Sequence, residues 1–240
     1  MKILSVSNSF GVDATRYLHG ICRAAGERVK IVTLYIGGCS LARHYRNMLS
    51  EEKAYDYYIN GMDSGLKVSL KEAILSDEWD VIVTQQCSPR SGKWDSYEPY
   101  LAELAAYFRR CCPKAALWWQ DTWSFEEGCP RFGLTGFANR AEMIPALRVC
   151  YEKAAETVGA AGRIPALEAM NRLYGAVGAE TYRDGFHASL GIGRYTLACL
   201  WFATFFGKDP TGNGFRDFDV EMTEEAIALG EKIAKETAGI

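Results

Sequence analysis

Residues 2–10 read Lys2-Ile3-Leu4-Ser5-Val6-Ser7-Asn8-Ser9-Phe10, a short and largely apolar run that gives way to small polar residues. The run predicts a buried β-strand over residues 2–7, and helical spacing of apolar residues predicts a helix over residues 13–25. A buried strand followed directly by a helix is typical of α/β proteins with parallel strands. Asn8 and Ser9 would then lie in the turn that leaves the strand.

The same alternation of strands and helices continues along the chain. Further strands are predicted over residues 29–36, 80–85, 115–119 and 164–166, and further helices over residues 41–59, 67–75, 96–112, 140–158, 193–206 and 223–237. Because the predicted strands are almost continuously apolar, we expect helices to cover both faces of the sheet. The sequence therefore predicts an α/β fold, a three-layer αβα sandwich with a central parallel sheet, formed by one domain over residues 1–240.

Charge and composition narrow the functional classes. The 240 residues carry a net charge of −3 and the pI is near 5.7, so nothing favours binding to nucleic acid or to an anionic membrane. The N-terminal apolar stretch is too short for a signal peptide, and Tyr195–Phe206 is too short to span a bilayer, which needs about 20 residues. These features predict a cytoplasmic protein. They do not indicate an oligomeric state.

The chain contains eight cysteines, several of them in apolar segments where a free cysteine behaves as a small hydrophobic residue. No Cys-x-x-Cys motif or Cys/His cluster indicates zinc, so no metal site is predicted. A reducing compartment is the simpler interpretation, although an even number of cysteines leaves disulfides open.

Small or polar residues follow each of the first four main predicted strands. They are Ser9, Gly37-Gly38, Gln85-Gln86 and Gln120-Asp121. In parallel α/β sheets, ligands bind at the carboxyl ends of the strands. A polar pair such as Gln85-Gln86 must also find hydrogen-bond partners at the end of a buried strand, and a catalytic crevice is one place that supplies them. The sequence therefore predicts a site at this edge of the sheet.

Near the other end of the chain stands Asp184-Gly185-Phe186-His187. An Asp three residues before a His lets one loop carry both partners of a serine nucleophile: one ring nitrogen reaches the hydroxyl and the carboxylate holds the other. The alternatives are structural. Ser9 could be a helix-capping residue, Asp184 and His187 a loop ion pair, and Gly37-Gly38 an ordinary turn.

Taken together, these motifs resemble those of the SGNH hydrolases, the GDSL-like esterase superfamily. Ser7-Asn8-Ser9 is similar to the first block of that family, with Ser in place of Gly, and Asp184–His187 is similar to the last block. Gly38 is similar to the glycine of the second block. Gln86 stands where the third block has Asn, as in the branch of sialic-acid and acetylxylan esterases. The segment Gly37–Leu41 also resembles a poorly characterised SGNH-like family of gut bacteria.

The resemblance implies a flavodoxin-like fold and acyl transfer without a metal or organic cofactor. Ser9 would attack an ester carbonyl, His187 would act as general base and then general acid, and Asp184 would orient His187 and stabilise its charged form. Water would then release the acyl group from Ser9.

The resemblance also implies an oxyanion hole formed by the Ser9 N–H, the Gly38 N–H and the Gln86 amide. Gln for Asn lengthens the last donor by one methylene, which leaves Gln85 open as the alternative. The glycine assignment could equally shift by one residue, to Gly37.

Substrate contacts are expected from Trp94, Trp123 and Asp121, which lie in predicted loops. Flat aromatic rings suit sugar faces and small acyl groups, although core packing would explain many of the aromatic residues, and Asp121 could instead cap a turn. The segment Trp123–Phe137 is a candidate rim loop or lid.

The sequence therefore favours a serine esterase that hydrolyses a short-chain ester, most plausibly an acetyl ester of a carbohydrate. Its partner would be a small-molecule or saccharide ester. The alternative is a non-catalytic saccharide- or ligand-binding module on the same fold, which the altered first and third blocks suggest. A nucleotide-binding doubly wound domain ranks last, because Gly11 is the only glycine where phosphate-binding loops need several.

Overall fold

A seven-stranded sheet lies at the centre of the computed structural model, which describes all 240 residues. The strands are β1 (Lys2–Ser7), β2 (Lys30–Tyr35), β3 (Tyr55–Ile59), β4 (Met62–Val68), β5 (Val81–Thr84), β6 (Ala116–Gln120) and β7 (Gly162–Ile164). Their spatial order is β4-β3-β2-β1-β5-β6-β7, and the five strands from β2 to β7 in that order are parallel. β1 and the turn that follows it therefore lie in the middle of the sheet.

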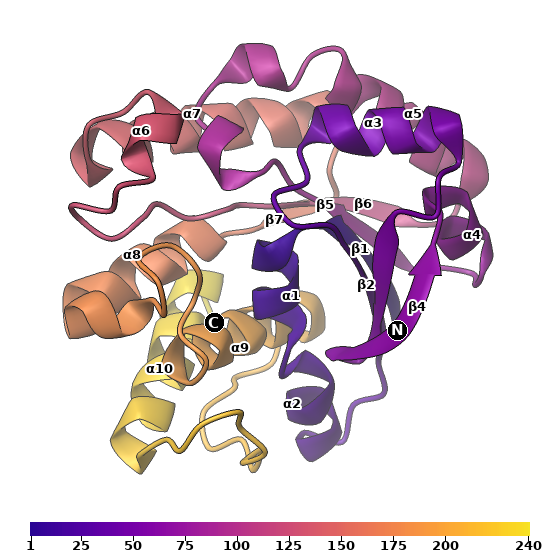
Figure 1. Ribbon diagram of the computed structural model, residues 1–240. Coiled ribbons are helices and arrows are strands. Elements are labelled where there is room, and N and C mark those ends of the chain that lie inside the picture. Colours follow the sequence, from indigo (N-terminus) through magenta and orange to yellow (C-terminus); the bar gives the residue numbers. More distant parts are fainter.

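Helices cover both faces of this sheet (Figure 1). One layer consists of α1 (Ser9–Thr15), α2 (Leu18–Ala24), α8 (Ala166–Val177), α9 (Ile192–Phe206) and α10 (Glu224–Ala238). The opposite layer consists of α3 (Leu41–Ser50), α5 (Tyr100–Cys111) and α7 (Arg140–Thr157), with α4 (Leu70–Leu75) against α3 and α5. A short helix, α6 (Phe132–Thr135), lies in the long loop after β6. The predicted three-layer α/β fold is confirmed.

The sheet is mixed rather than wholly parallel, because β3 is antiparallel to β2 and β4 is antiparallel to β3. The helix predicted over residues 41–59 is wrong beyond Ser50, where the chain leaves the helix through a left-handed Glu51 with φ of 54°. Residues 55–59 instead alternate buried and more exposed side chains, the period of a strand. The Asn60-Gly61 turn, with φ of 52° and 83°, then forms the tight hairpin between β3 and β4.

The first predicted helix also differs from the structure. It begins at Ser9, ahead of the predicted start at Asp13, because the Asn8 side chain caps it, and it is interrupted before Leu18. Asp13 therefore lies inside α1, where it is fully buried.

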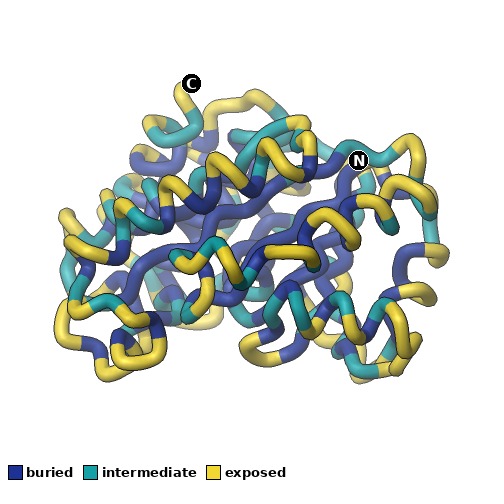
Figure 2. Tube along the Cα trace, turned by 90° about the horizontal axis from the view of Figure 1, so that it is seen from above, coloured by how far each residue is buried: buried dark blue, intermediate teal, exposed yellow.

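One hydrophobic cluster of 61 buried residues connects the sheet to both helical layers. The central strands β1, β2 and β5 are buried along most of their length, whereas the edge strand β4 is exposed. Figure 2 shows buried segments inside the molecule and exposed segments on its outside. No helix combines the length and the apolar character that crossing a bilayer requires.

Candidate active site

The turn after β1 holds Ser9 at the carboxyl edge of the sheet. Asn8 caps α1, since its side chain accepts a hydrogen bond from the Phe10 N–H at 3.1 Å. Gly11 lets the helix lie close to the strand, because a Cβ at this position would come within 2.0 Å of the Ser7 Oγ. The result is a tight strand-to-helix turn with Ser9 as the first helical residue.

The side chain of Asn8 ties this turn to both neighbouring turns. Its Nδ2 donates to the Cys39 carbonyl oxygen, after β2, at 3.1 Å. Its Oδ1 accepts a second hydrogen bond, at 2.7 Å, from Nε2 of Gln85 at the end of β5. Asn8 and Gln85 are both almost completely buried, so these bonds are shielded from water. Three strand ends are thereby locked together beside Ser9.

The structure brings Ser9, His187 and Asp184 into one hydrogen-bonded chain. His187 Nε2 lies 2.8 Å from Ser9 Oγ, and His187 Nδ1 lies 2.6 Å from Asp184 Oδ2. The other carboxylate oxygen of Asp184 accepts the backbone N–H of His187 at 2.8 Å. Burial alone would raise the pKa of Asp184, but the hydrogen bonds from His187 outweigh it and hold the pKa below its usual value. The carboxylate therefore stays ionised beside the imidazole.

Residues 183–188, which we call the His187 loop, are anchored to α1 by buried charges. Arg183 Nη1 donates to both carboxylate oxygens of Asp13, at 2.9 and 3.0 Å. Arg194 Nε, on α9, donates to the same carboxylate at 2.9 Å. Because Asp13 is fully buried, its charge is compensated by these two guanidinium groups rather than by water. The helix that begins at Ser9 thus also holds the loop that carries His187.

Aromatic packing supports the same loop from the side. The rings of Phe10 and Trp123 are stacked with centroids 4.0 Å apart and planes 6° apart. Trp123 Nε1 donates to the Phe186 carbonyl oxygen at 2.8 Å, and the Phe186 ring centroid lies 3.8 Å from that of His187. This packing restricts how far the imidazole can turn away from Ser9.

A cavity of about 260 Å³ opens beside Ser9 and His187. Gly37 and Gly38, in the turn after β2, form part of its wall, and Gly38 adopts a left-handed φ of 60°. The backbone N–H groups of Ser9, Gly37 and Gly38 have no acceptor within the protein. Free N–H groups beside a hydroxyl are what a developing oxyanion requires.

Gln86 does not reach this cavity, so its predicted role as an oxyanion donor is wrong. It is fully buried, and its Nε2 donates to the Ser96 carbonyl oxygen and hydroxyl at 3.0 and 3.1 Å. Its Oε1 accepts the N–H groups of Leu41 and Cys87 at 3.0 and 2.9 Å. The amide is therefore fully used in joining the turns after β2 and β5. The alternative, Gln85, is buried and engaged at the turn after β1.

The three predicted substrate contacts also lie away from the cavity. Trp123 is fully buried, and Trp94 packs beneath the Lys153 ammonium, which lies 4.1 Å from its ring centroid. Asp121 is buried and paired with Arg163 at 2.8 Å; burial raises its pKa to about 6 even though the guanidinium opposes this. These predictions are wrong because aromatic and polar content indicated exposed loops where the chain packs inward.

The cavity is lined instead by side chains that the sequence did not single out, among them Tyr35, Cys87, Ser88, Arg131 and Phe186. Two signals were available. Cys87 and Ser88 directly follow the glutamine pair at the end of β5, and Arg131 lies in the predicted rim loop. Burial raises the pKa of the Cys87 thiol to about 11. The Ser88 hydroxyl has no hydrogen-bond partner in the protein.

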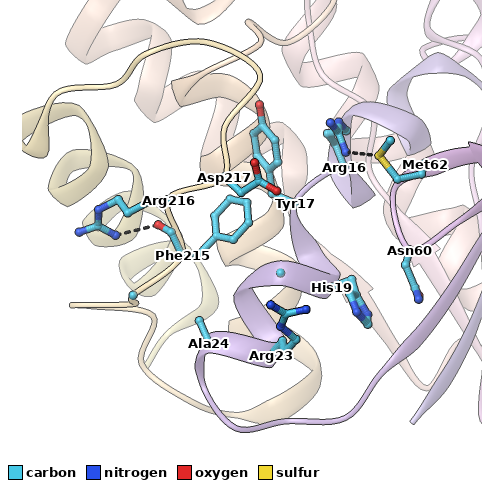
Figure 3. A pocket seen from close by; sticks show the side chains of 12 residues that line it. Arg16, Tyr17, His19, Arg23, Ala24, Asn60, Met62, Phe215, Arg216 and Asp217 are labelled. Atoms are coloured by element: carbon cyan, nitrogen blue, oxygen red, sulfur yellow. Dashed lines mark hydrogen bonds between the residues drawn. The ribbon is translucent and has the colours of Figure 1, made fainter.

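A second cavity, of about 380 Å³, lies between α2, the β3–β4 turn and the loop around Phe215 (Figure 3). Two of its arginines already have carboxylate partners: Arg16 pairs with Asp219, and Arg216 pairs with Glu224 at 2.9 Å. No serine or cysteine lines it. Elsewhere in the protein, no group of three or more His, Cys, Asp and Glu side chains is arranged to hold a metal ion. Of these two cavities, only the smaller one places a serine hydroxyl beside a histidine ring.

Comparisons with known proteins agree with this architecture. A DUF4886 family protein from Bacteroides uniformis is similar over 98% of this chain and 93% of its own, with 31% identity and a TM-score of 0.91. A proposed SGNH hydrolase from Slackia heliotrinireducens shares the fold at 22% identity and a TM-score of 0.61, over 86% of this chain and 99% of its own. A proposed GDSL-like lipase from Parabacteroides merdae does so at 14% identity and a TM-score of 0.56, over 99% and 95%.

The family assignment rests on the sequence as well as on the fold. Residues 2–237 match the family model described as a domain of unknown function, DUF4886. No curated protein matches the sequence. The fold shared with the SGNH and GDSL-like structures confirms the resemblance noted from the sequence motifs. The chain belongs to the DUF4886 family and has the fold of the SGNH hydrolases.

Proposed function

We propose that this protein is a serine esterase that cleaves a short-chain ester through an acyl-enzyme. The observation that carries the proposal is the unbroken chain of hydrogen bonds from Asp184 through His187 to the Ser9 hydroxyl, which ends at an open cavity. A nucleophile within hydrogen-bond reach of a base, and a base oriented by a third group, is the recurring arrangement of activated serine.

In the first step, the Ser9 Oγ attacks the ester carbonyl and its proton passes to His187 Nε2. Asp184 fixes the tautomer, because Nδ1–H donates to its carboxylate and leaves Nε2 free to accept. The same carboxylate stabilises the imidazolium that forms. Collapse of the tetrahedral intermediate then expels the alcohol, which takes the proton from His187 Nε2.

Negative charge on the former carbonyl oxygen would be received by the N–H groups of Ser9 and of Gly38 or Gly37, which have no other acceptor. Ser88, whose hydroxyl is free at the cavity wall, replaces the buried glutamines as our candidate for a third donor. Loss of one such donor typically lowers kcat by about 10² to 10³. In the second half-reaction, water activated by His187 attacks the acyl-enzyme and releases the acid.

The size of the cavity supports a small acyl group. A space of about 260 Å³ is just below the range usual for drug-sized ligands, roughly 300 to 1,000 Å³, which favours a short acyl group over a long one. The alcohol would extend past the rings of Tyr35 and Phe186 at the cavity wall. An acetylated saccharide, bound as a small-molecule ester, is the substrate class that we put forward first, although the tryptophans that suggested it lie elsewhere.

Hydrolysis of p-nitrophenyl acetate by the wild-type protein and by Ser9→Ala tests the proposal. We expect the alanine variant to lose at least about 10³-fold in kcat/KM while its circular dichroism and melting temperature stay unchanged. Ser50→Ala, at the exposed end of α3, is the matched control and should keep full activity. Mass spectrometry of the intact protein during turnover should detect an acyl group on the wild type only. Equal rates for wild type and Ser9→Ala would contradict the esterase and favour a non-catalytic binding module.

A further inference from the structure

Arg131 is the one residue with a permanent charge among the 12 that line the cavity beside Ser9. It precedes α6 in the loop after β6, and no Asp or Glu is part of the cavity wall. A guanidinium in this position sets the electrostatic potential that a substrate meets next to the scissile bond.

The guanidinium of Arg131 has no partner of its own. It makes no ion pair within 4 Å and donates no hydrogen bond, whereas seven other arginines of this protein each pair with a carboxylate. Arg131 is exposed, so its guanidinium N–H groups remain accessible from the mouth of the cavity. An unpaired arginine here is therefore available to a ligand.

Packing nevertheless gives this arginine a defined place. Its Cζ lies 3.7 Å from the centroid of the Phe186 ring, whose other contacts include the His187 ring at 3.8 Å between centroids. Phe186 is itself fixed, because its carbonyl oxygen accepts the Trp123 Nε1–H. Since guanidinium N–H groups lie in the plane of the group, contact through one face leaves them free to donate. The charge is thus held one aromatic ring away from the catalytic imidazole.

Resting on the esterase function proposed above, we infer that Arg131 selects esters that carry a carboxylate close to the scissile bond. The planar fork of N–H donors matches the two oxygens of a carboxylate, and charge-assisted hydrogen bonds of this kind are stronger than neutral ones. The carboxylate can belong to the acyl group, as in a half-ester of a dicarboxylic acid, or to the alcohol, as in an acetylated hydroxy acid. Arg131 is in either case a specificity-determining residue that contacts substrate.

Two matched pairs of esters test the inference and separate these two sources. Mono(4-nitrophenyl) succinate against 4-nitrophenyl butyrate varies the charge of the acyl group. 4-Acetoxybenzoate against methyl 4-acetoxybenzoate varies the charge of the alcohol. In at least one pair, Arg131→Met should lower the charged-to-neutral ratio of kcat/KM by about 10- to 100-fold, mainly through KM, and Arg131→Lys should restore part of the ratio.

Arg23→Met is the matched control, because Arg23 is an exposed arginine of α2 at the other cavity and its loss changes the net charge equally. The inference is overturned if Arg131→Met leaves the ratio unchanged in both pairs, or if Arg23→Met lowers it as much. Binding of the same esters to Ser9→Ala, with and without Arg131→Met, measures charge recognition without hydrolysis. Absence of Ser9-dependent turnover would contradict the esterase. Even then, a preference for the charged esters in binding that Arg131→Met removes would support the role of Arg131.

Discussion

The two ends of the chain that meet in the site are held in place by different physical means. On the Ser9 side, the turn after β1 is fixed by neutral amide hydrogen bonds, from Asn8 and Gln85, between loops that all follow strands of one sheet. The His187 loop belongs to no strand of the sheet, and its one β-bridge joins Tyr182 to Ala188. It is fixed by buried charges and by ring packing.

The Ser9 turn and the His187 loop depend on different interactions for their position. Neutral hydrogen bonds between strand ends form as a consequence of the sheet, because the sheet already places their donors and acceptors side by side. The buried carboxylate of Asp13 has no such support, since its charge is tolerable only while Arg183 and Arg194 both contact it. The His187 side should therefore be the more sensitive to single substitutions.

The largest effect is expected from Asp184, to which the proposed mechanism assigns the orientation of His187. Asp184→Asn should lower kcat/KM by about 10⁴, or roughly 5 kcal/mol of transition-state stabilisation, because the amide no longer holds the required tautomer. Stability should change little, since the Asp184 side chain is 41% exposed and asparagine can still accept the loop N–H groups. Steady-state kinetics and thermal melting measure the two effects. Activity within tenfold of wild type would contradict the assigned role.

The second-largest effect is expected from Asp13, the buried carboxylate that anchors the His187 loop. Asp13→Ala should reduce the free energy of unfolding by about 3 to 5 kcal/mol, because two guanidinium groups lose their buried partner. Asp219→Ala is the matched control, since Asp219 also contacts Arg194 but is 21% exposed. Urea denaturation should give a clearly smaller loss for the control. If both variants lose the same free energy of unfolding, burial of the ion pair is not what makes Asp13 important.

On the Ser9 side, we expect a smaller effect from the buried glutamines. Gln86→Leu should cost about 1 to 3 kcal/mol of stability, because the N–H groups of Leu41 and Cys87 are left buried without an acceptor. Gln85→Leu should cost less, since it removes one donor to Asn8, whose Oδ1 keeps the Phe10 N–H. Denaturation curves of the two variants check the order. The opposite order would show that Gln85 is the main brace of these turns.

The smallest effect concerns a single hydrogen bond to the His187 loop. Trp123→Phe keeps a ring to stack on Phe10 but loses the bond to the Phe186 carbonyl oxygen, whereas Trp119→Phe loses an Nε1–H that has no partner. Both substitutions reduce buried ring volume. The first should therefore be the more destabilising by about 1 kcal/mol in chemical denaturation. No difference would mean that ring packing alone holds the loop.

This comparison also explains what could be predicted from the sequence. Ser9 lies at a strand end and Asp184 and His187 share one short motif, so local pattern was enough to nominate them. The apolar runs predict the fold, but the tyrosine-rich strand Tyr55–Ile59 is too short for its period of two to stand out from the helical pattern before it.

Long-range contacts account for the remaining errors. Nothing local shows that the Gln86 amide meets Ser96, or that Trp123 turns inward beneath the His187 loop. The place of Arg131 at the cavity likewise depends on a ring 55 positions away in sequence. Side chains whose partners come from distant segments cannot be assigned from spacing alone.

Cys87 and Ser9 line the same cavity but should react with different reagents. Cys87 is 4% exposed, and the pKa of its thiol, about 11, keeps it protonated near neutral pH. Only the thiolate attacks an alkylating reagent and displaces its halide, so iodoacetamide at pH 7 should leave the proposed esterase turnover intact. A fluorophosphonate should abolish that turnover by modifying Ser9. One cavity thus contains a serine hydroxyl that is hydrogen-bonded to an imidazole and a thiol that stays protonated near neutral pH.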